Sequence, residues 1–257
     1  MQYDKKNIGL MLKLNISNIY LEKVSSTQTF AKENYKNFIT DSITCILAEE
    51  QTNGTGRFQR KWVATPFQNI TATFYFSLPS QTKDITALGL LFCFSLATYL
   101  IDKGFNPKIR WPNDILLSNK KLSGVLCETI FQGNTVHLFL GVGINVNMDK
   151  EQLSQIDQPA TSLKNETYKE WNKKELLDNL QKYFLEDLKV FLEKGFEPFF
   201  NKFEKLLAYK NEIITLFDGE NSYQGELISI TPSGELKLKL ENGELKIFKA
   251  GDILKKH

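Results

Sequence analysis

The sequence predicts an α+β fold, in which a mixed β-sheet flanked by helices is followed by a small β-barrel. Residues 1–208 contain both helical and strand patterns, and these do not repeat as strand–helix–strand units. Residues 209–257 contain only short strand patterns separated by turn residues. We therefore expect two domains, a large one of residues 1–208 and a small C-terminal one of residues 209–257.

The composition is that of an ordinary folded protein. The chain has 257 residues, 42% of them hydrophobic, and its 32 Lys and Arg against 30 Asp and Glu leave a net charge of only +2. This balance argues against a broad electrostatic surface for nucleic acid or membrane. Cys45, Cys93 and Cys127 are far apart and form no CxxC pair, so neither a zinc site nor a disulfide scaffold is expected. No signal-peptide pattern begins the chain, and we expect a cytoplasmic protein.

The first elements follow from cap residues and alternation. Ser25 and Ser26 can cap a helix that ends near Tyr35. Residues 42–48 are typical of a short buried strand, and residues 69–78 alternate as a second strand does. The Gly-rich, basic segment between these strands is expected to be a loop.

An apolar helix is expected next, beginning at Asp84 and ending near Gly104. Its most apolar part, residues 85–101, is shorter than the ~20 residues that a membrane span needs. We interpret it as a buried core helix, and we expect no membrane association.

Three β-rich pieces follow, near residues 108–117, 122–131 and 136–146. Turn residues at Ser118-Asn119 and Gly133-Asn134 separate them, which indicates an antiparallel meander.

The last helices and the C-terminal strands carry clear end signals. Asn172 can cap a helix that ends at Gly195, and residues 198–207 form a second amphipathic piece. Turns are then expected at Asp218-Gly219, at residues 232–234 and at Asn242-Gly243, the last being a strong hairpin signal.

The first chemical motif is the loop GTGRFQRKW at residues 54–62. Its glycines permit close approach of the backbone to a ligand, and arginine binds phosphate or carboxylate with two parallel hydrogen bonds. A solvated basic surface loop anchored by Trp62 explains the same residues equally well. The motif is neither a Walker A loop nor a dinucleotide fingerprint.

Three further motifs are RWPNDI at residues 110–115, KKLSGVLCE at 120–128 and GVGINVN at 141–147. Pro112 cannot donate to a sheet ladder and so marks an edge or break that presents Asn113 and Asp114. Lys121 alone could be only a charged residue at a strand end. Asn145 and Asn147 are expected on one face of a strand, where a buried amide can read a base edge or can be a satisfied core residue.

The four motifs, in this order and spacing, resemble those of the biotin–protein ligase family. The resemblance extends to Ser26-Thr27, to Gln51, to PATSL at residues 159–163 and to the β-rich tail, so it covers about residues 20–256. It implies a catalytic domain of the class II aminoacyl-tRNA synthetase and biotin ligase type, followed by an SH3-like barrel. It also implies a biotin–[acetyl-CoA-carboxylase] ligase that uses ATP, biotin and Mg²⁺, with a biotin carboxyl carrier protein of that or another biotin-dependent carboxylase as its partner.

The resemblance also implies a role for each matching residue. The catalytic residues would be Lys121, Arg57 and Arg60, and no protein side chain is expected to bind a metal. The biotin contacts would be Ser26, Thr27, Gln51, Gly54, Arg57, Lys121 and Gly124. The contacts to ATP or the adenylate would be Arg57, Arg60, Trp62, Asn113, Asp114, Lys121 and Asn145.

This chain departs from the family pattern at two positions. Thr55 stands where many members have an arginine between the loop glycines, and Arg110 stands where a lysine usually precedes WPND. Thr55 removes one possible contact to biotin or phosphate. Arg110 keeps the charge but changes the donor geometry, so we do not count it as catalytic.

Three other functions were considered. A lipoate or octanoate ligase or transferase would share the fold, but Ser26, Thr27 and Gln51 suit a polar ring, and Cys127 is expected to be a buried, inert thiol. Some family members are also DNA-binding repressors, but fewer than twenty-five residues precede Ser25, so we expect no DNA-binding domain and no nucleic-acid partner. A module that only binds biotin would not need the basic loop and Lys121. The resemblance permits a monomer or a homodimer.

Overall fold

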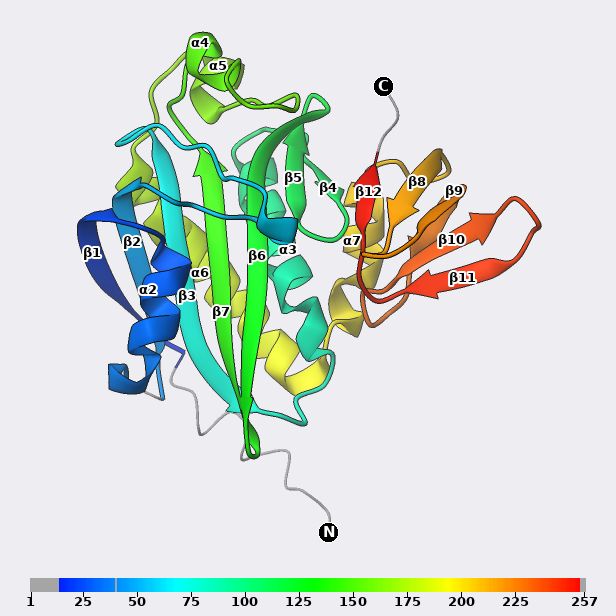
Figure 1. Cartoon of the computed structure of the whole chain (residues 1–257), viewed down its shortest axis with the longest axis horizontal. Helices are drawn as coiled ribbons and strands as arrows, with labels where there is room; N and C mark the ends of the chain where they lie inside the picture. Colours follow the sequence, from blue (N-terminus) through cyan, green and yellow to red (C-terminus); the bar gives the residue numbers. More distant parts are fainter. Residues whose placement is uncertain (1–13, 40, 255–257) are drawn as a thin grey trace.

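The computed structural model describes residues 14–39 and 41–254, which form two β-sheets and the helices that cover them (Figure 1). The absence of a signal peptide was predicted from the first residues of the chain, and residues 1–13 lie outside the described part.

The larger sheet has seven strands in the order β1-β2-β3-β7-β6-β5-β4. Only β1 and β2 are parallel, with α2 connecting them, and all the other neighbours are antiparallel. The prediction of a mixed sheet flanked by helices is therefore confirmed. The strands are β1 (Ile16–Val24), β2 (Ile43–Gln51), β3 (Asn69–Pro79), β4 (Lys108–Arg110), β5 (Asp114–Leu117), β6 (Lys120–Gln132) and β7 (Thr135–Asn145).

Two details of the sheet differ from the sequence prediction. Strand β1 was not predicted, because it is a partly exposed edge strand in which polar residues interrupt the apolar alternation. Residues 108–117 were predicted as one β-rich piece, but they form two short strands, and Arg110 pairs with Asp114 across the reversal. Pro112 lies in this reversal, as expected of a residue that cannot donate to a ladder.

The two faces of the large sheet carry different layers. On β3, Phe74 and Phe76 belong to the main core with helices α3 (Leu88–Asp102) and α6 (Lys173–Lys194). Tyr75 points to the opposite face, where it packs in a second cluster with residues of α2 (Thr27–Asn34). Because side chains alternate along a strand, one face of the sheet forms the core and the other is open to a ligand beside α2.

The predicted helices are present, although the apolar one opens with a 3-10 turn (Ile85–Ala87) that the side chain of Asp84 does not cap. The Ser26 hydroxyl accepts a hydrogen bond from the Thr29 amide and caps α2, and Asn172 caps α6, which ends at Gly195. In α3 every residue except Thr98, Ile101 and Asp102 is buried, so the prediction of a core helix is confirmed. The expectation that it is too short for a membrane span is not, because the helical stretch Ile85–Asp102 is long and apolar enough to cross one. Helix α7 is also present. Helices α4 and α5 were not predicted, because each is too short for a periodic pattern. The remaining helices are α4 (Lys150–Leu153), α5 (Leu163–Thr167) and α7 (Phe200–Leu206).

The smaller sheet has five antiparallel strands in the order β11-β10-β9-β8-β12, and its three predicted turns all connect neighbouring strands. A buried hydrogen bond connects it to the larger sheet: the indole Nε1 of Trp111 donates to the carbonyl of Gly234, at 2.9 Å. The division at residues 208 and 209 stays a prediction. The strands are β8 (Ile213–Phe217), β9 (Ser222–Ile230), β10 (Leu236–Leu240), β11 (Leu245–Phe248) and β12 (Asp252–Leu254).

We predict that Phe184→Ala lowers the free energy of unfolding by about 3–5 kcal/mol, because it removes a ring from the centre of the core. Phe184 on α6 is 0% exposed, and its ring centroid lies 5.8 Å from that of Phe74 and 5.0 Å from that of Phe92. Denaturant unfolding measures the change. The matched control is Phe131→Ala, at a ring that is 62% exposed, where we expect a change within about 0.5 kcal/mol. Equal losses in both variants would contradict this packing.

Candidate active site

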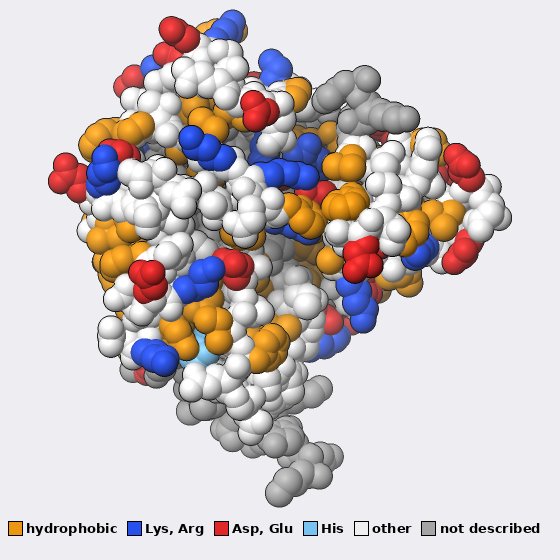
Figure 2. All heavy atoms as spheres, viewed as in Figure 1, with side chains coloured by type: hydrophobic (Ala, Val, Ile, Leu, Met, Phe, Trp, Pro, Cys, Tyr) orange, Lys and Arg blue, Asp and Glu red, His pale blue; other side chains and the backbone are white. Residues whose placement is uncertain are grey.

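A cavity of about 700 Å³ opens on the face of the large sheet that carries α2. Its walls are the start of α2, the Gly-rich loop, strands β5 to β7, the segment of residues 155–160 and strand β12 of the small sheet. In Figure 2, Lys and Arg side chains gather around the hollow between the two sheets. The cavity therefore presents positive charge although the whole chain is almost neutral.

Two glycines of β7 make the floor of the cavity flat. A Cβ atom at Gly141 would lie 2.7 Å from Oε1 of Gln28, and one at Gly143 would fall within the indole ring of Trp62. Both glycines line the cavity, while Leu140 and Ile144 beside them belong to the core. Side chains at these positions would displace Gln28 and Trp62, so the glycines are required for the shape of the site.

A network of neutral polar groups lies at the α2 end of the cavity. Oε1 of Gln51 accepts hydrogen bonds from the amide and the hydroxyl of Thr27, at 2.7 and 3.0 Å. The Thr27 hydroxyl also bonds that of Thr73 at 2.9 Å, and Thr73 donates to Oε1 of Gln28 at 3.1 Å. Ser26 lies beside them at the helix cap. This wall can hydrogen-bond a small, uncharged, polar ring.

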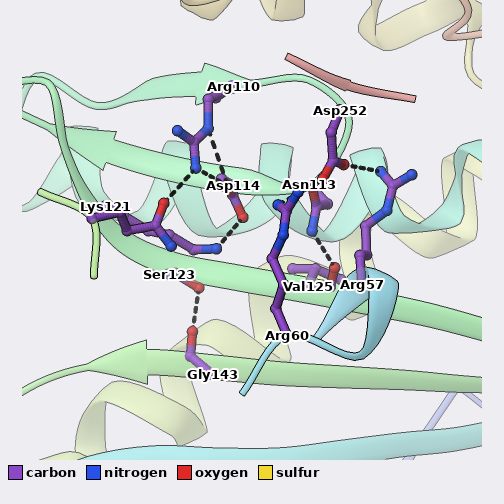
Figure 3. Close-up of polar contacts among 11 residues, drawn as sticks. Arg57, Arg60, Arg110, Asn113, Asp114, Lys121, Ser123, Val125, Gly143 and Asp252 are labelled. Atoms are coloured by element: carbon purple, nitrogen blue, oxygen red, sulfur yellow. Dashed lines mark hydrogen bonds and ion pairs between the residues drawn. The ribbon is translucent and has the colours of Figure 1, made fainter. Parts of the chain in front are cut away.

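A buried carboxylate, Asp114, organises the cations on the opposite side (Figure 3). Its Oδ1 lies 2.7 Å from Nζ of Lys121, and its Oδ2 accepts from the guanidinium of Arg110. Burial acts to raise the pKa of Asp114, but Lys121 and Arg110 outweigh it and hold the pKa below its usual value. Gly124 leaves room for this pair, because a Cβ there would lie 3.1 Å from Nζ of Lys121.

The Gly-rich loop contributes a second group of charges. Nη1 of Arg60 donates to Asp252 at 2.7 Å, and Nη1 of Arg57 lies 3.4 Å from the same carboxylate. Burial lowers the pKa of Arg57, and the negative charges of Asp252 and Asp114 act in the opposite direction. Between the arginines, Phe58 has a positive φ of 52°, which turns the loop sharply.

Apart from Oδ1 of Asp114, which pairs with Lys121, two buried polar atoms of the described cavity-lining side chains lack a hydrogen-bond partner: Oδ1 of Asn145 and Nε1 of Trp62. The amide nitrogen of Asn145 donates to the carbonyl of Thr161 at 3.1 Å, which fixes the side chain. Buried polar atoms normally have partners, so these two are suited to a ligand. Asn147 was expected beside Asn145, but its amide is bonded to the backbone of Trp171, and it does not line the cavity.

The structure brings almost all of the predicted site residues to this one cavity. Arg57, Arg60 and Lys121 share it, as the sequence predicted. Gly54 does not line it and instead lies behind Gln51 and Trp62, and its carbonyl accepts from the Trp62 amide at 2.9 Å. The roles of these residues toward a ligand stay predictions. The other predicted residues that line the cavity are Ser26, Thr27, Gln51, Trp62, Asn113, Asp114, Gly124 and Asn145.

Other residues of the site were missed from the sequence. Gln28 and Thr73 sit within helix and strand patterns that explain them without a ligand, and Asp252 lies in the smaller, C-terminal sheet. The alternation of residues 69–78 would have placed Thr73 on the face opposite Phe74, and the position of Gln28 just after the Ser26 cap would have placed it at the start of the helix. Only a three-dimensional structure places Asp252 beside Arg60.

The residues near the cavity do not offer a thiol nucleophile. Burial raises the pKa of Cys127 to about 12, so its thiolate is scarce at neutral pH. Cys127 is partly rather than fully buried, so the prediction of a buried thiol is only partly correct, while the raised pKa supports an inert one. Within residues 14–39 and 41–254 no group of three or more His, Cys, Asp or Glu side chains is arranged to hold a metal ion.

Comparisons with known proteins agree with this fold. Residues 20–145 match the biotin/lipoate A/B protein ligase family. The chain is 32% identical over 203 residues to the biotin–[acetyl-CoA-carboxylase] ligase of Paracoccus denitrificans, covering 76% of this chain and 83% of that protein. It is 28% identical over 211 residues to the bifunctional ligase/repressor BirA of Escherichia coli, covering 81% of this chain and only 65% of that protein.

A solved structure gives the same result. The biotin protein ligase of Aquifex aeolicus, in complex with biotin and ATP, superposes with a TM-score of 0.78 and 32% sequence identity. The match covers 93% of this chain and 97% of that one. With its fold, its cation-lined cavity and these similarities, the chain belongs to the biotin protein ligases, within the biotin/lipoate A/B protein ligase family.

Proposed function

We propose that this protein is a ligase that activates biotin with ATP to biotinyl-5′-AMP and transfers the biotinyl group to a lysine of a biotin carboxyl carrier protein. The observation that carries the proposal is the convergence of Arg57, Arg60 and Lys121 on one cavity with a neutral polar end. The complex of the similar Aquifex aeolicus ligase with biotin and ATP supports the choice of substrates, and the name of the Paracoccus denitrificans relative supports the acceptor.

In the first step a biotin carboxylate oxygen attacks the α-phosphorus of ATP, and the bond to pyrophosphate breaks. The two reactants are both anions, so the protein must offset their repulsion and align them. Lys121 would lie between the carboxylate and the α-phosphate, while Arg57 and Arg60 would donate to the phosphate oxygens. No protein nucleophile is needed.

The neutral end of the cavity would hold the ureido ring of biotin through Ser26, Thr27 and Gln51. Adenine would lie near Asn145, whose unpartnered Oδ1 can accept a hydrogen bond from the adenine amino group. Trp62 would pack against the ligand, and Asn113 and Asp114 would lie beside the phosphates.

Mg²⁺ would enter as part of the metal–ATP complex. Asp114 and Asp252 are each paired with two cationic side chains, so the triphosphate oxygens rather than a carboxylate cluster suit the metal. When bound, the ion neutralises phosphate charge and assists the departure of pyrophosphate.

In the second step an uncharged acceptor lysine attacks the carbonyl carbon of the mixed anhydride. The bond to AMP breaks, AMP leaves with the electron pair, and the amine loses a proton to solvent. The Gly-rich loop would keep water from the adenylate meanwhile.

We further propose that the protein acts in the cytoplasm as a monomer or homodimer, without nucleic acid or a membrane as partner.

Lipoate or octanoate transfer is the alternative for this fold. The raised pKa of Cys127 disfavours an octanoyl transferase that uses a cysteine, and the hydrogen-bonding wall around Thr27 suits a ring rather than a linear acyl chain. The Paracoccus denitrificans relative and the Aquifex aeolicus structure are both named as biotin ligases, which also favours biotin.

The direct test is incubation with biotin, ATP, Mg²⁺ and a purified biotin carrier domain. We expect the mass of the carrier to increase by one biotinyl group, and no increase when ATP is omitted or when lipoate replaces biotin. Labelling by lipoate but not by biotin would reverse the assignment.

We predict that Lys121→Ala lowers biotin-dependent ATP–pyrophosphate exchange by roughly 10²–10³-fold, because the reacting centre loses a positively charged hydrogen-bond donor. The matched control is Lys120→Ala, the exposed neighbour, which should exchange at the wild-type rate. Circular dichroism checks that both variants are folded. A folded Lys121→Ala variant with near-normal exchange would remove Lys121 from the mechanism.

We predict that Arg57→Gly releases the adenylate from the site, because the loop loses one of its two contacts with Asp252 and a phosphate donor. The released adenylate should biotinylate bystander lysines, for example those of added serum albumin, measured by a streptavidin blot. Arg57→Lys, which keeps the charge, is the control. If labelling stays confined to the carrier domain, retention by the loop is not the function of Arg57.

A further inference from the structure

The small C-terminal sheet contacts the Gly-rich loop through two neighbouring side chains. Asp252 of β12 and Phe217 of β8 are direct partners in the strand register. Asp252 binds Arg57 and Arg60, and the Phe217 ring lies 5.9 Å from the ring of Phe58, which stands between them in the loop. The small sheet thus contacts the loop through an ion-pair cluster and, beside it, a contact between two aromatic rings.

We infer that Asp252 is a positioning residue for ATP, which holds Arg57 and Arg60 at the cavity so that they can bind the nucleotide phosphates. This inference rests on the proposed function and adds the C-terminal sheet to the nucleotide site. Asp252 acts through the two arginines and is not itself a catalytic residue.

The burial of the partners supports a fixed anchor. The Asp252 side chain is only 9% exposed, whereas that of Arg60 is 59% exposed. A free, exposed arginine samples many rotamers, and ordering it on ligand binding costs entropy. Because the carboxylate of Asp252 is fixed in a sheet and already orders the arginine, less entropy is lost when the ligand binds.

The anchor leaves donors for a second anion. A guanidinium group has five N–H donors, and the contacts of both arginines to Asp252 are through Nη1. Both guanidinium groups also make cation–π contacts with the Phe58 ring, whose centroid lies 5.4 Å from Cζ of Arg57 and 5.7 Å from Cζ of Arg60. Phosphate oxygens can therefore bind at Nε and Nη2 while Asp252 stays in place.

The charges also favour this arrangement. Arg60 acts to lower the pKa of Arg57 by repulsion, and Asp252 acts to raise it. One carboxylate between two guanidinium groups reduces their repulsion and leaves an excess of one positive charge facing the cavity. Without Asp252 the arginines would repel each other, and the loop would be free to move away from the cavity.

The test is the steady-state kinetics of ATP–pyrophosphate exchange with the full chain. We expect Asp252→Asn, which keeps the shape but removes the charge, to raise KM for ATP by about tenfold. KM for biotin should change less than twofold. Asp252→Glu should restore much of the ATP affinity. The matched control is Glu241→Gln, an exposed carboxylate in the β10–β11 turn, which should leave both constants unchanged.

A double variant separates positioning from general stability. If Asp252 acts through Arg60, then Asp252→Asn combined with Arg60→Gln should raise KM for ATP by less than the product of the two single effects. Thermal unfolding of each variant accompanies the kinetics.

Each other outcome overturns the inference. An unchanged KM for ATP would make the contact irrelevant, a lowered KM would make Asp252 a competitor of phosphate, and an equal rise for biotin would indicate loosening of the whole site. Absence of exchange in the wild-type chain would instead contradict the proposed function, so the two failures are distinguishable.

Discussion

The site depends on carboxylates that hold cations in place without neutralising them completely. Asp114 is buried, and a buried carboxylate without a partner would cost several kcal/mol, so Lys121 and Arg110 stabilise it as well as supplying charge to the cavity. Because two cations surround one carboxylate, positive charge remains for an anionic ligand. Asp252 has the same relation to Arg57 and Arg60. The cavity is therefore prepared for two negatively charged substrates before either arrives.

The alternation of the β-strands determines where these groups can act. One face of the large sheet is filled by α3 and α6, which leaves the opposite face for the ligand. On that face Gly141 and Gly143 carry no side chain, so Gln28 and Trp62 can lie against the strands. The polar end and the cationic end of the cavity are thus separated along a flat floor, in the same way that biotin separates a neutral ring from a carboxylate.

The sequence predicted the parts of this structure that local signals determine. The Ser26 and Asn172 caps, the buried helix α3 and the Asn242-Gly243 hairpin follow from neighbouring residues, and all are present. The edge strand β1 was missed because its apolar and polar residues do not alternate regularly, and only its pairing with β2 identifies it as a strand. The site was predicted by a resemblance of motifs, so residues outside the motifs, such as Thr73, were missed. Asp252 could not be predicted because its contact with Arg60 spans 192 positions and depends on how two sheets pack.

That long separation has a consequence for biosynthesis. Strand β12 is the last strand of the described chain, and it completes a loop that is translated much earlier. The wall around Thr27 and Gln51 comes from the first part of the chain and can form while the ribosome is still at work. The nucleotide end forms later, because its carboxylate anchor, Asp252, is translated 192 positions after Arg60. A nascent chain would therefore gain the surroundings for biotin before it gains those for the nucleotide, and adenylation would have to wait until strand β12 has left the ribosome.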